Sequence, residues 1–139
     1  MRDKNASDRI EGYRRQIVEL QSLVERVPIS DQVLGYAWAL VRASRPAAAE
    51  SPEFIRRFVS WGAGPRGMLT LVMCAKSRAL LAGRRHATVG DVRALAKPAL
   101  RHRIACNYAG QAAGMNSDRL IEMLLDAVPD DKPYEPPSA

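Results

Sequence analysis

The sequence contains few of the residues, and none of the short motifs, from which common enzyme active sites are built. It has two cysteines and two histidines in 139 residues. No G-x-x-x-x-G-K-[ST] loop is present to hold nucleotide phosphates, and neither a G-x-S-x-G nor an H-E-x-x-H motif occurs. The residues alone therefore predict neither a nucleophile with its base nor a hydrolytic metal centre in this chain.

The scarcity of cysteine also argues against a disulfide framework and a structural zinc site. Two cysteines allow at most one disulfide and make no disulfide framework. Cys74 lies in an apolar stretch that favours a small buried residue. Cys74, Cys106, His86 and His102 provide four zinc-binding side chains by number, but their spacing contains no short ligand pair. We therefore expect reduced, structural cysteines and no bound metal.

Long hydrophobic runs are missing as well. The N-terminus, MRDKNASDRIEG, is polar and lacks the apolar core of a signal peptide. No apolar run approaches the roughly 20 residues that a transmembrane helix needs. We therefore expect a cytoplasmic protein without membrane contact.

Aromatic residues are scarce, at 6%, whereas hydrophobic residues make up 47% of the chain. The apolar residues recur mainly at three- and four-residue steps, which predicts amphipathic helices packed around a core of Leu, Val, Ala and Met. We expect an all-α bundle of about five to six helices, with room for a short extended segment near 100–104. The domain would span 10–129, between a flexible segment 1–9 and a disordered, Pro-rich tail 130–139.

Capping and breaking residues set the expected helix limits. Pro65 suits the first position of a helix that is apolar on most sides, and this helix is predicted to be central and buried. Gly83 is its expected C-terminal cap, and Thr88 and Asp91 resemble a capping box. The predicted helices cover 10–27, 30–45, 51–61, 65–82, 88–96 and 117–128.

The first predicted helix carries a regular apolar stripe. Its members recur at three- and four-residue steps, and they are Ile10, Tyr13, Ile17, Leu20, Val24 and Val27. Core packing is the favoured role for such a stripe, and docking of a partner is the alternative.

The segment Gly62-Ala63-Gly64-Pro65-Arg66 stands directly before the central helix. A helix N-terminus is already positive and has spare N–H groups, so Arg66 in the first turn is mildly unfavourable unless an anion lies there. Backbone donors and a guanidinium together would suit a phosphate. A solvated arginine without a ligand is the alternative, and the residues alone favour that alternative.

An ordered set of motifs resembles the helical lid of MoxR-type AAA+ ATPases. The stretch WGAGPRG at 61–67 is similar to the family's G-A-S-P-R-A motif, and an Ala/Leu-rich helix follows it. HATVGDVRALAKPAL then resembles the family's V-T-P-x-D-V helix, RHRI follows at 101–104, and VPISDQVLGYAWALVRASR resembles the helix that opens the lid. The resemblance covers about 17–129.

This resemblance implies a function that the residues alone do not. The chain would be the lid that closes over ATP and Mg²⁺ held by a separate α/β core, in a ring, expected to be hexameric, that remodels other proteins. Arg66 would be the sensor-2 residue that reaches the terminal phosphate, and Gly62, Ala63, Gly64 and Pro65 would accompany it at the nucleotide. Proteins with von Willebrand factor A domains are further partners implied by the family.

The chain departs from the family at Gly64, which replaces the usual Ser and loses an N-cap hydroxyl. Arg45, His102 and Arg103 also match family segments; they are secondary site candidates, for which structural roles are favoured. Because Walker A, Walker B and sensor 1 are missing, we expect no ATP hydrolysis from this chain alone, although the parent protein would be an ATP hydrolase.

The charge leaves other functions open. The net charge is +6 and the pI about 9.8, which permits phosphate, nucleic acid or an acidic protein surface as partner. A small basic module that binds nucleic acid is one alternative, although its best-defined helix is apolar rather than a polar recognition helix. A helical protein-interaction domain is the other.

Overall fold

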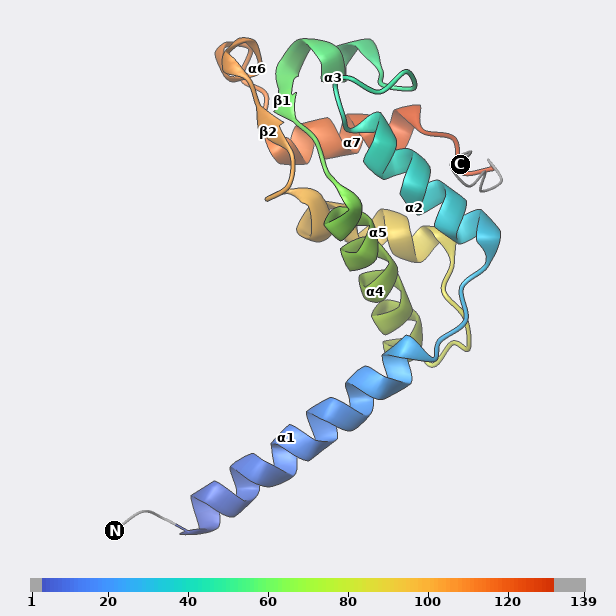
Figure 1. Ribbon diagram of the computed structural model, residues 1–139, viewed down its shortest axis with the longest axis vertical. Helices are drawn as coiled ribbons and strands as arrows, with labels where there is room; N and C mark the ends of the chain where they lie inside the picture. Colours follow the sequence, from blue (N-terminus) through green and yellow to red (C-terminus); the bar gives the residue numbers. More distant parts are fainter. Residues whose placement is uncertain (1–3, 132–139) are drawn as a thin grey trace.

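The structure, a computed structural model, describes residues 4–131, and Figure 1 shows a helical body from which one long helix projects. The all-α prediction is confirmed, with two short strands as its extended part. In chain order the elements are α1 (Lys4–Glu25), α2 (Asp31–Ala43), α3 (Glu53–Phe58), β1 (Val59–Trp61), α4 (Pro65–Leu81), α5 (Val89–Leu100), β2 (Ala105–Cys106), α6 (Tyr108–Ala112) and α7 (Ser117–Ala127). The described residues thus contain one helix more than the upper expectation, because the five-residue α6 has no distinct apolar period.

The core of the body lies between α2, α4, α5 and α7. Helices α4 and α5 pack most extensively on each other; α2 packs on both of them, and α7 packs on α5 and α2. The largest buried apolar side chains are Tyr36, Leu40, Ile55, Leu71, Leu100, Leu120, Ile121 and Leu124. Burial of such side chains from several helices stabilises the body as one unit.

The expected caps are formed. Ser30 Oγ accepts a hydrogen bond from the Val33 amide at 3.4 Å, which begins α2. Thr88 and Asp91 form a reciprocal capping box at the start of α5. Gly83, at φ +69°, follows α4 in a left-handed conformation that glycine adopts without strain. These local signals are readable in sequence because both partners lie within a few residues.

The prediction that the third helix continues to residue 61 is wrong. Helix α3 ends at Phe58, and the next residues form β1, in which Val59 pairs with Cys106 and Trp61 with Ala105 of β2. The pairing is antiparallel and spans more than forty residues of sequence. Backbone groups that could have continued the helix are satisfied instead by a distant strand.

The prediction that the stripe of the first helix packs into the core is wrong for most of its length. Ile10, Tyr13, Ile17 and Leu20 are each more than half exposed, and Val27, beyond the end of α1, is the buried member. Figure 1 shows α1 leaving the body as an arm, so the body touches only its last part. Periodicity identifies an apolar face but does not say whether the same chain covers it.

The ends of the chain differ from expectation in one respect. The segment 1–9, predicted to be flexible, is helical from Lys4 onward. Residues 1–3, and the predicted tail from 132 onward, lie outside the described residues. The domain limits 10–129 stay predictions.

Helix α4 is central, but it is not buried all round. Leu71, Ala75 and Ala79 are buried, whereas Leu69 and Leu81 are exposed. The expected full burial is therefore wrong, because the body covers only one side of α4. Within residues 4–131, no helix combines the length and apolarity that crossing a membrane requires.

Candidate functional site

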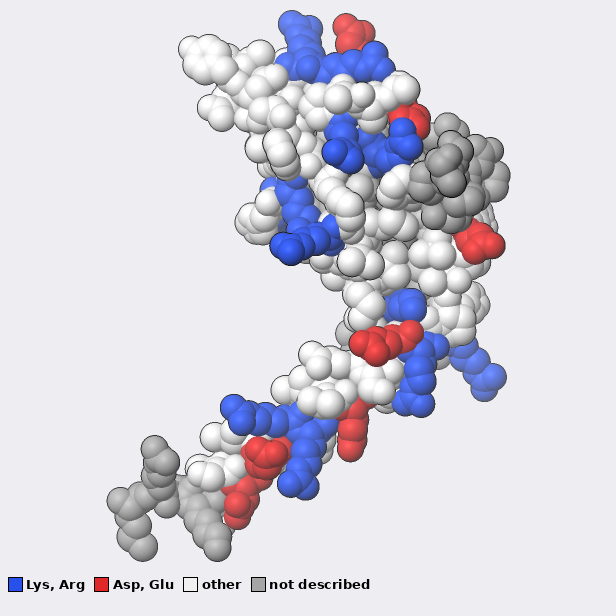
Figure 2. Space-filling model, in the orientation of Figure 1, with Lys and Arg blue, Asp and Glu red and all other residues white. Residues whose placement is uncertain are grey.

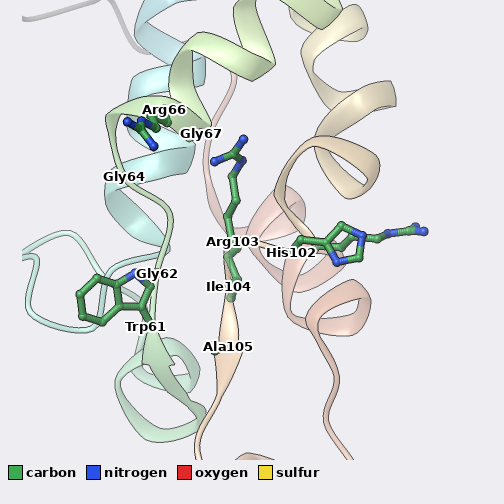
Figure 3. A pocket seen from close by; sticks show the side chains of 10 residues that line it. Trp61, Gly62, Gly64, Arg66, Gly67, His102, Arg103, Ile104 and Ala105 are labelled. Atoms are coloured by element: carbon green, nitrogen blue, oxygen red, sulfur yellow. The ribbon is translucent and has the colours of Figure 1, made fainter.

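The two segments that the sequence singled out lie side by side. They line a hollow of about 390 Å³, formed by Trp61, Gly62, Gly64, Arg66, Gly67, Arg101, His102, Arg103, Ile104 and Ala105. Pairing of β1 with β2 brings the start of α4 against the chain that follows α5 (Figure 3). The site therefore depends on a contact between residues about forty positions apart.

The loop before α4 is held by a serine that sequence reasoning missed. Ser44, fully buried after α2, accepts a hydrogen bond from the Ala63 amide at 2.9 Å. The same hydroxyl donates to the Val41 carbonyl at 2.6 Å. The Ala63 amide is thus used inside the protein and is not available to a ligand, whereas Ala63 was predicted to take part in nucleotide binding.

Gly62 is required at its position for steric reasons. A Cβ there would lie 2.2 Å from the Ser44 carbonyl oxygen and 2.7 Å from the Arg45 Cα. At Gly64, by contrast, a Cβ would meet nothing within 4 Å. The first glycine allows close approach of two backbone segments, whereas the second could be replaced without a clash.

The start of α4 leaves donors unused. Gly64 is the N-cap, supplies no side-chain hydrogen bond, and is followed by Pro65 in the first turn. Within residues 4–131, neither the Arg66 amide nor its exposed guanidinium has a hydrogen-bond or ion-pair partner. A cation at the positive end of a helix, without a compensating anion, is unfavourable in itself.

Arg103 approaches the same helix from the opposite wall. Its guanidinium donates to Thr70 Oγ1 at 3.2 Å, and Thr70 Oγ1 donates to the Arg66 carbonyl at 2.8 Å. In Figure 3 the Arg103 side chain extends toward the start of α4, whereas that of His102 points away from it. The structure thus brings Arg103 and Arg66 together and leaves His102 at the rim.

Gly67 makes this approach possible by having no side chain. A Cβ at Gly67 would lie 3.4 Å from the Cδ of Arg103, 3.4 Å from Leu100 Cδ2 and 3.1 Å from Ala63 Cβ. These distances are tight enough that the neighbours would have to move. The glycine that weakens the first turn of α4 also lets Arg103 pack beside it.

The remaining candidate, Arg45, is not part of the hollow. Its backbone passes beneath Gly62, and its side chain is exposed and does not line the cavity. Arg101 lines the cavity instead and pairs with Asp118 at 3.0 Å. Sequence reasoning gave no reason to choose Arg101 over its neighbours.

The charge around the hollow is positive. Four of its lining residues are basic side chains or histidine, and the lining contains no acid. Figure 2 shows Lys and Arg side chains over the start of α4 with no acid among them in that view. A concave basic surface with unused donors is suited to an anion.

At the C-terminal end of α4, by contrast, arginine side chains are paired with a buried carboxylate. Asp91 is fully buried and accepts hydrogen bonds from Arg84 at 2.5 and 2.7 Å and from Arg78 at 2.6 Å. Its Oδ2 also accepts from the Thr88 amide at 2.8 Å. The Arg84 guanidinium, together with these other donors, holds the pKa of Asp91 well below its usual range, against the effect of burial.

No metal centre is found in the described part of the chain, where no three His, Cys, Asp or Glu side chains group as metal ligands. The two cysteines are unpaired. The chemistry that the hollow offers is therefore cationic hydrogen bonding from arginine.

Comparisons with known proteins agree on one relationship. The family described as AAA lid domain matches residues 54–123. Chaperone MoxR1 of Mycobacterium tuberculosis (strain ATCC 25618 / H37Rv) is 26% identical over 112 residues, which cover 81% of this chain and 30% of that protein. A candidate ATPase of Cytophaga hutchinsonii ATCC 33406, known from a crystal structure, has a TM-score of 0.73 and 30% identity, over 78% of this chain and 33% of that one. The chain thus spans about a third of the length of the relatives it matches.

Proposed function

We propose that this chain, which belongs to the AAA lid domain family, closes over a nucleotide held by an AAA+ ATPase core and presents Arg66 to its terminal phosphate. The MoxR-type resemblance read from the sequence is confirmed by the similarity to Chaperone MoxR1. The assignment of Arg66 rests on its match to the sensor-2 arginine of the family motif and on its surroundings.

One observation carries the proposal. The first turn of α4 offers an amide and a guanidinium that have no partner within residues 4–131, and both belong to Arg66 at the edge of a basic hollow. Both groups are stabilised only when a negative charge approaches the helix end. The terminal phosphate of a nucleotide would supply that charge, as the MoxR-type resemblance implies for the arginine of this motif.

Some residues of the site would bind the phosphate, and others would position the residues that bind it. Arg66 would contact the phosphate, and Arg103 would add a second positive charge while its bond to Thr70 Oγ1 fixes its orientation. Ser44 and Gly62 hold the loop so that α4 begins at a defined place. An arginine placed in this way stabilises charge that develops on a phosphoryl group during transfer.

The rest of the machinery would lie on other parts of the ATPase. The core would provide the Walker motifs, sensor 1, ATP and Mg²⁺, and neighbouring subunits would complete a ring, as the MoxR resemblance implies. Protein remodelling and von Willebrand factor A domain partners belong to the same proposal. Lid closure driven by nucleotide would be the contribution of this chain to that cycle.

The decisive experiment measures ATP hydrolysis by the AAA+ ATPase that contains or recruits this lid. Arg66→Ala should lower turnover on the order of 100-fold, the cost of removing one charge-stabilising donor. Arg85→Ala is a matched control, because Arg85 is also exposed, lies beyond the other end of α4 and has no partner among the described residues. Equal turnover by the Arg66→Ala and Arg85→Ala enzymes would refute the proposal.

A second experiment tests the site in this chain alone. Titration with ATP, and with tripolyphosphate as an anion without a base, should shift the amide resonances of Arg66 and Gly67, with a Kd on the order of 1 mM. The Arg66→Ala chain should lose these shifts, and the Arg85→Ala chain should keep them. Shifts spread evenly over all basic residues would indicate screening of charge rather than a site.

Binding to generic duplex DNA tests the hypothesis that the chain is a nucleic-acid-binding module. A nucleic-acid module should bind DNA tightly at low salt and lose affinity steeply as salt rises. Tight, Arg66-independent DNA binding together with absent tripolyphosphate shifts would replace the lid proposal with that hypothesis.

A further inference from the structure

Helix α1 carries two and a half heptads of apolar residues. Ile10, Ile17 and Val24 occupy one position of the seven-residue repeat, and Tyr13 and Leu20 occupy the position three residues later. Alternation of three- and four-residue steps is the spacing with which one helix packs along another in a coiled coil. Branched residues at the first position favour a two-stranded pairing when leucine fills the second, as Leu20 does here.

The stripe is solvent-exposed in the described chain. Ile10, Tyr13, Ile17 and Leu20 are each more than half exposed. In Figure 1 the arm points away from the body, and only its last part reaches α4, where Lys76 Nζ donates to the Glu25 carbonyl at 3.0 Å. Within residues 4–131, the chain thus leaves most of the stripe uncovered.

Helix α1 has few of the local features that stabilise an isolated helix. It has no acid in its first turn and no basic residue in its last, and Gly12 lies within it. Such a helix is marginal in water unless packing on its apolar face adds stability.

Charges beside the stripe indicate what the partner carries. The positions that flank a coiled-coil seam are occupied by Ser7, Arg9, Arg14, Gln16, Gln21 and Leu23, which include two arginines and no acid. The acids of the helix, such as Glu11 and Glu19, occupy positions away from the seam. The seam is thus bordered by positive charge.

A second copy of α1 fits this border poorly. In a parallel pair, Arg9 of one copy would face Arg14 of the other, and in an antiparallel pair centred on the stripe Arg14 would face Arg14. Flanking charges of one sign select a partner of the opposite sign.

We propose that α1 is a docking arm for an amphipathic partner helix that flanks its own apolar seam with Asp or Glu. Ile10, Tyr13, Ile17 and Leu20 form the buried seam of the complex. Arg9 and Arg14 set the choice of an acidic partner. The arm meets α4 near Lys76, whereas the hollow lies at the start of α4.

The test uses the whole chain and two designed peptides of about three heptads. Both have Ile and Leu in the seam, and their flanking positions are all Glu in one peptide and all Lys in the other. The acidic peptide repels itself and remains free to pair. Anisotropy of labelled peptide should show the acidic peptide binding at least roughly tenfold more tightly than the basic one.

Two neighbouring substitutions provide a matched control. Ile17→Asp places a charge in the seam and should weaken binding of the acidic peptide roughly 100-fold. Val18→Asp makes a similar change at an exposed residue off the seam and should leave binding within about threefold. Because both residues are exposed, the body should unfold at the same denaturant concentration in both variants.

The remaining outcomes overturn the proposal. Equal or absent binding of the two peptides would show that the arm does not select an acidic helix. Sedimentation that reveals a dimer of the chain, lost on Ile17→Asp, would show that a second copy covers the stripe. The double change Arg9→Glu and Arg14→Glu should reverse the preference, and a retained acidic preference would exclude the arginines as its cause.

Discussion

The two ends of α4 differ in whether their charged side chains have partners within the chain. At the C-terminal end, Arg84 and Arg78 converge on the buried carboxylate of Asp91, within 2.5 to 2.7 Å. At the N-terminal end, the Arg66 guanidinium has no partner within residues 4–131, although buried Ser44 holds the loop that precedes it. At the C-terminal end, which we call the closed end, the charged groups are paired within the chain. The N-terminal end, which we call the open end, is held in place but has unused hydrogen-bond donors.

This difference separates stability from ligand binding within one helix. Groups whose hydrogen bonds are all made within the fold stabilise it, and their removal leaves buried atoms unsatisfied. Groups without partners add little to stability and are available to an external anion. Substitutions at the C-terminal end should therefore change the free energy of unfolding, and substitutions of Arg66 should change anion binding.

The largest expected effect is at the closed end. Asp91→Ala removes the capping side chain of α5 and the acceptor of two arginines, and should lower the free energy of unfolding by about 2–4 kcal/mol. The loss falls short of that for a fully buried pair because the side chains of Arg78 and Arg84 are 47% and 34% exposed and can regain water. Urea unfolding followed by circular dichroism measures it.

Asp118→Ala is the control for this change. Asp118 pairs with Arg101, but both side chains are more than 40% exposed, so the loss should stay below about 1 kcal/mol. A similar loss for both variants would show that burial does not distinguish the two ion pairs, and the contrast drawn for Asp91 would fail.

The next effect tests whether the open end is rigid. Gly62→Ala forces a Cβ to within 2.2 Å of the Ser44 carbonyl oxygen and should destabilise the body by about 2–3 kcal/mol. Gly64→Ala meets nothing within 4 Å and, as a change to a poorer N-cap residue, should cost at most about 1 kcal/mol. Equal midpoints for the two variants in thermal unfolding would mean that the loop is not held against Ser44.

The sequence predicted those features whose partners lie close together in the chain. The capping box of Thr88 and Asp91 was predicted because three residues separate its members, and Pro65 marked the start of α4. Segments 61–67 and 101–104 were singled out through the family resemblance, but the prediction did not include the hollow that they line together. The placement of Arg103 beside Arg66 depends on strand pairing that no local signal announces.

Other features could not be predicted because their partners are distant or outside the described chain. Ser44 is a single small polar residue, and only the fold shows that the Ala63 amide reaches it. Trp61 belongs to a strand because Ala105 pairs with it. The stripe of α1 has the period of a core helix, yet period alone does not distinguish a core contact from a docking face.

Acid should weaken the closed end selectively. The pKa of Asp91 is held below its usual value in the folded chain, so the unfolded state takes up the proton first as pH falls. Stability contributed by the carboxylate is therefore present at neutral pH and declines below about pH 5, with a slope of at most about 1.4 kcal/mol per pH unit. Urea midpoints between neutral pH and about pH 3 measure this decline, and Asp91→Asn should flatten it. An unchanged profile in that variant would assign the acid sensitivity to other carboxylates.

The smallest expected effect on stability is at Arg66. Arg66→Ala removes a positive charge from the positive end of α4 and introduces a better helix former, so unfolding should shift by less than about 0.5 kcal/mol, toward greater stability. Tripolyphosphate should reverse the order, because an anion that binds only the folded wild-type chain raises its stability by mass action. Unfolding midpoints of both chains, with and without tripolyphosphate, measure this reversal. A large loss of stability in Arg66→Ala without the anion would make Arg66 a structural residue like Arg84, and the two ends of α4 would then differ only in the number of their hydrogen bonds.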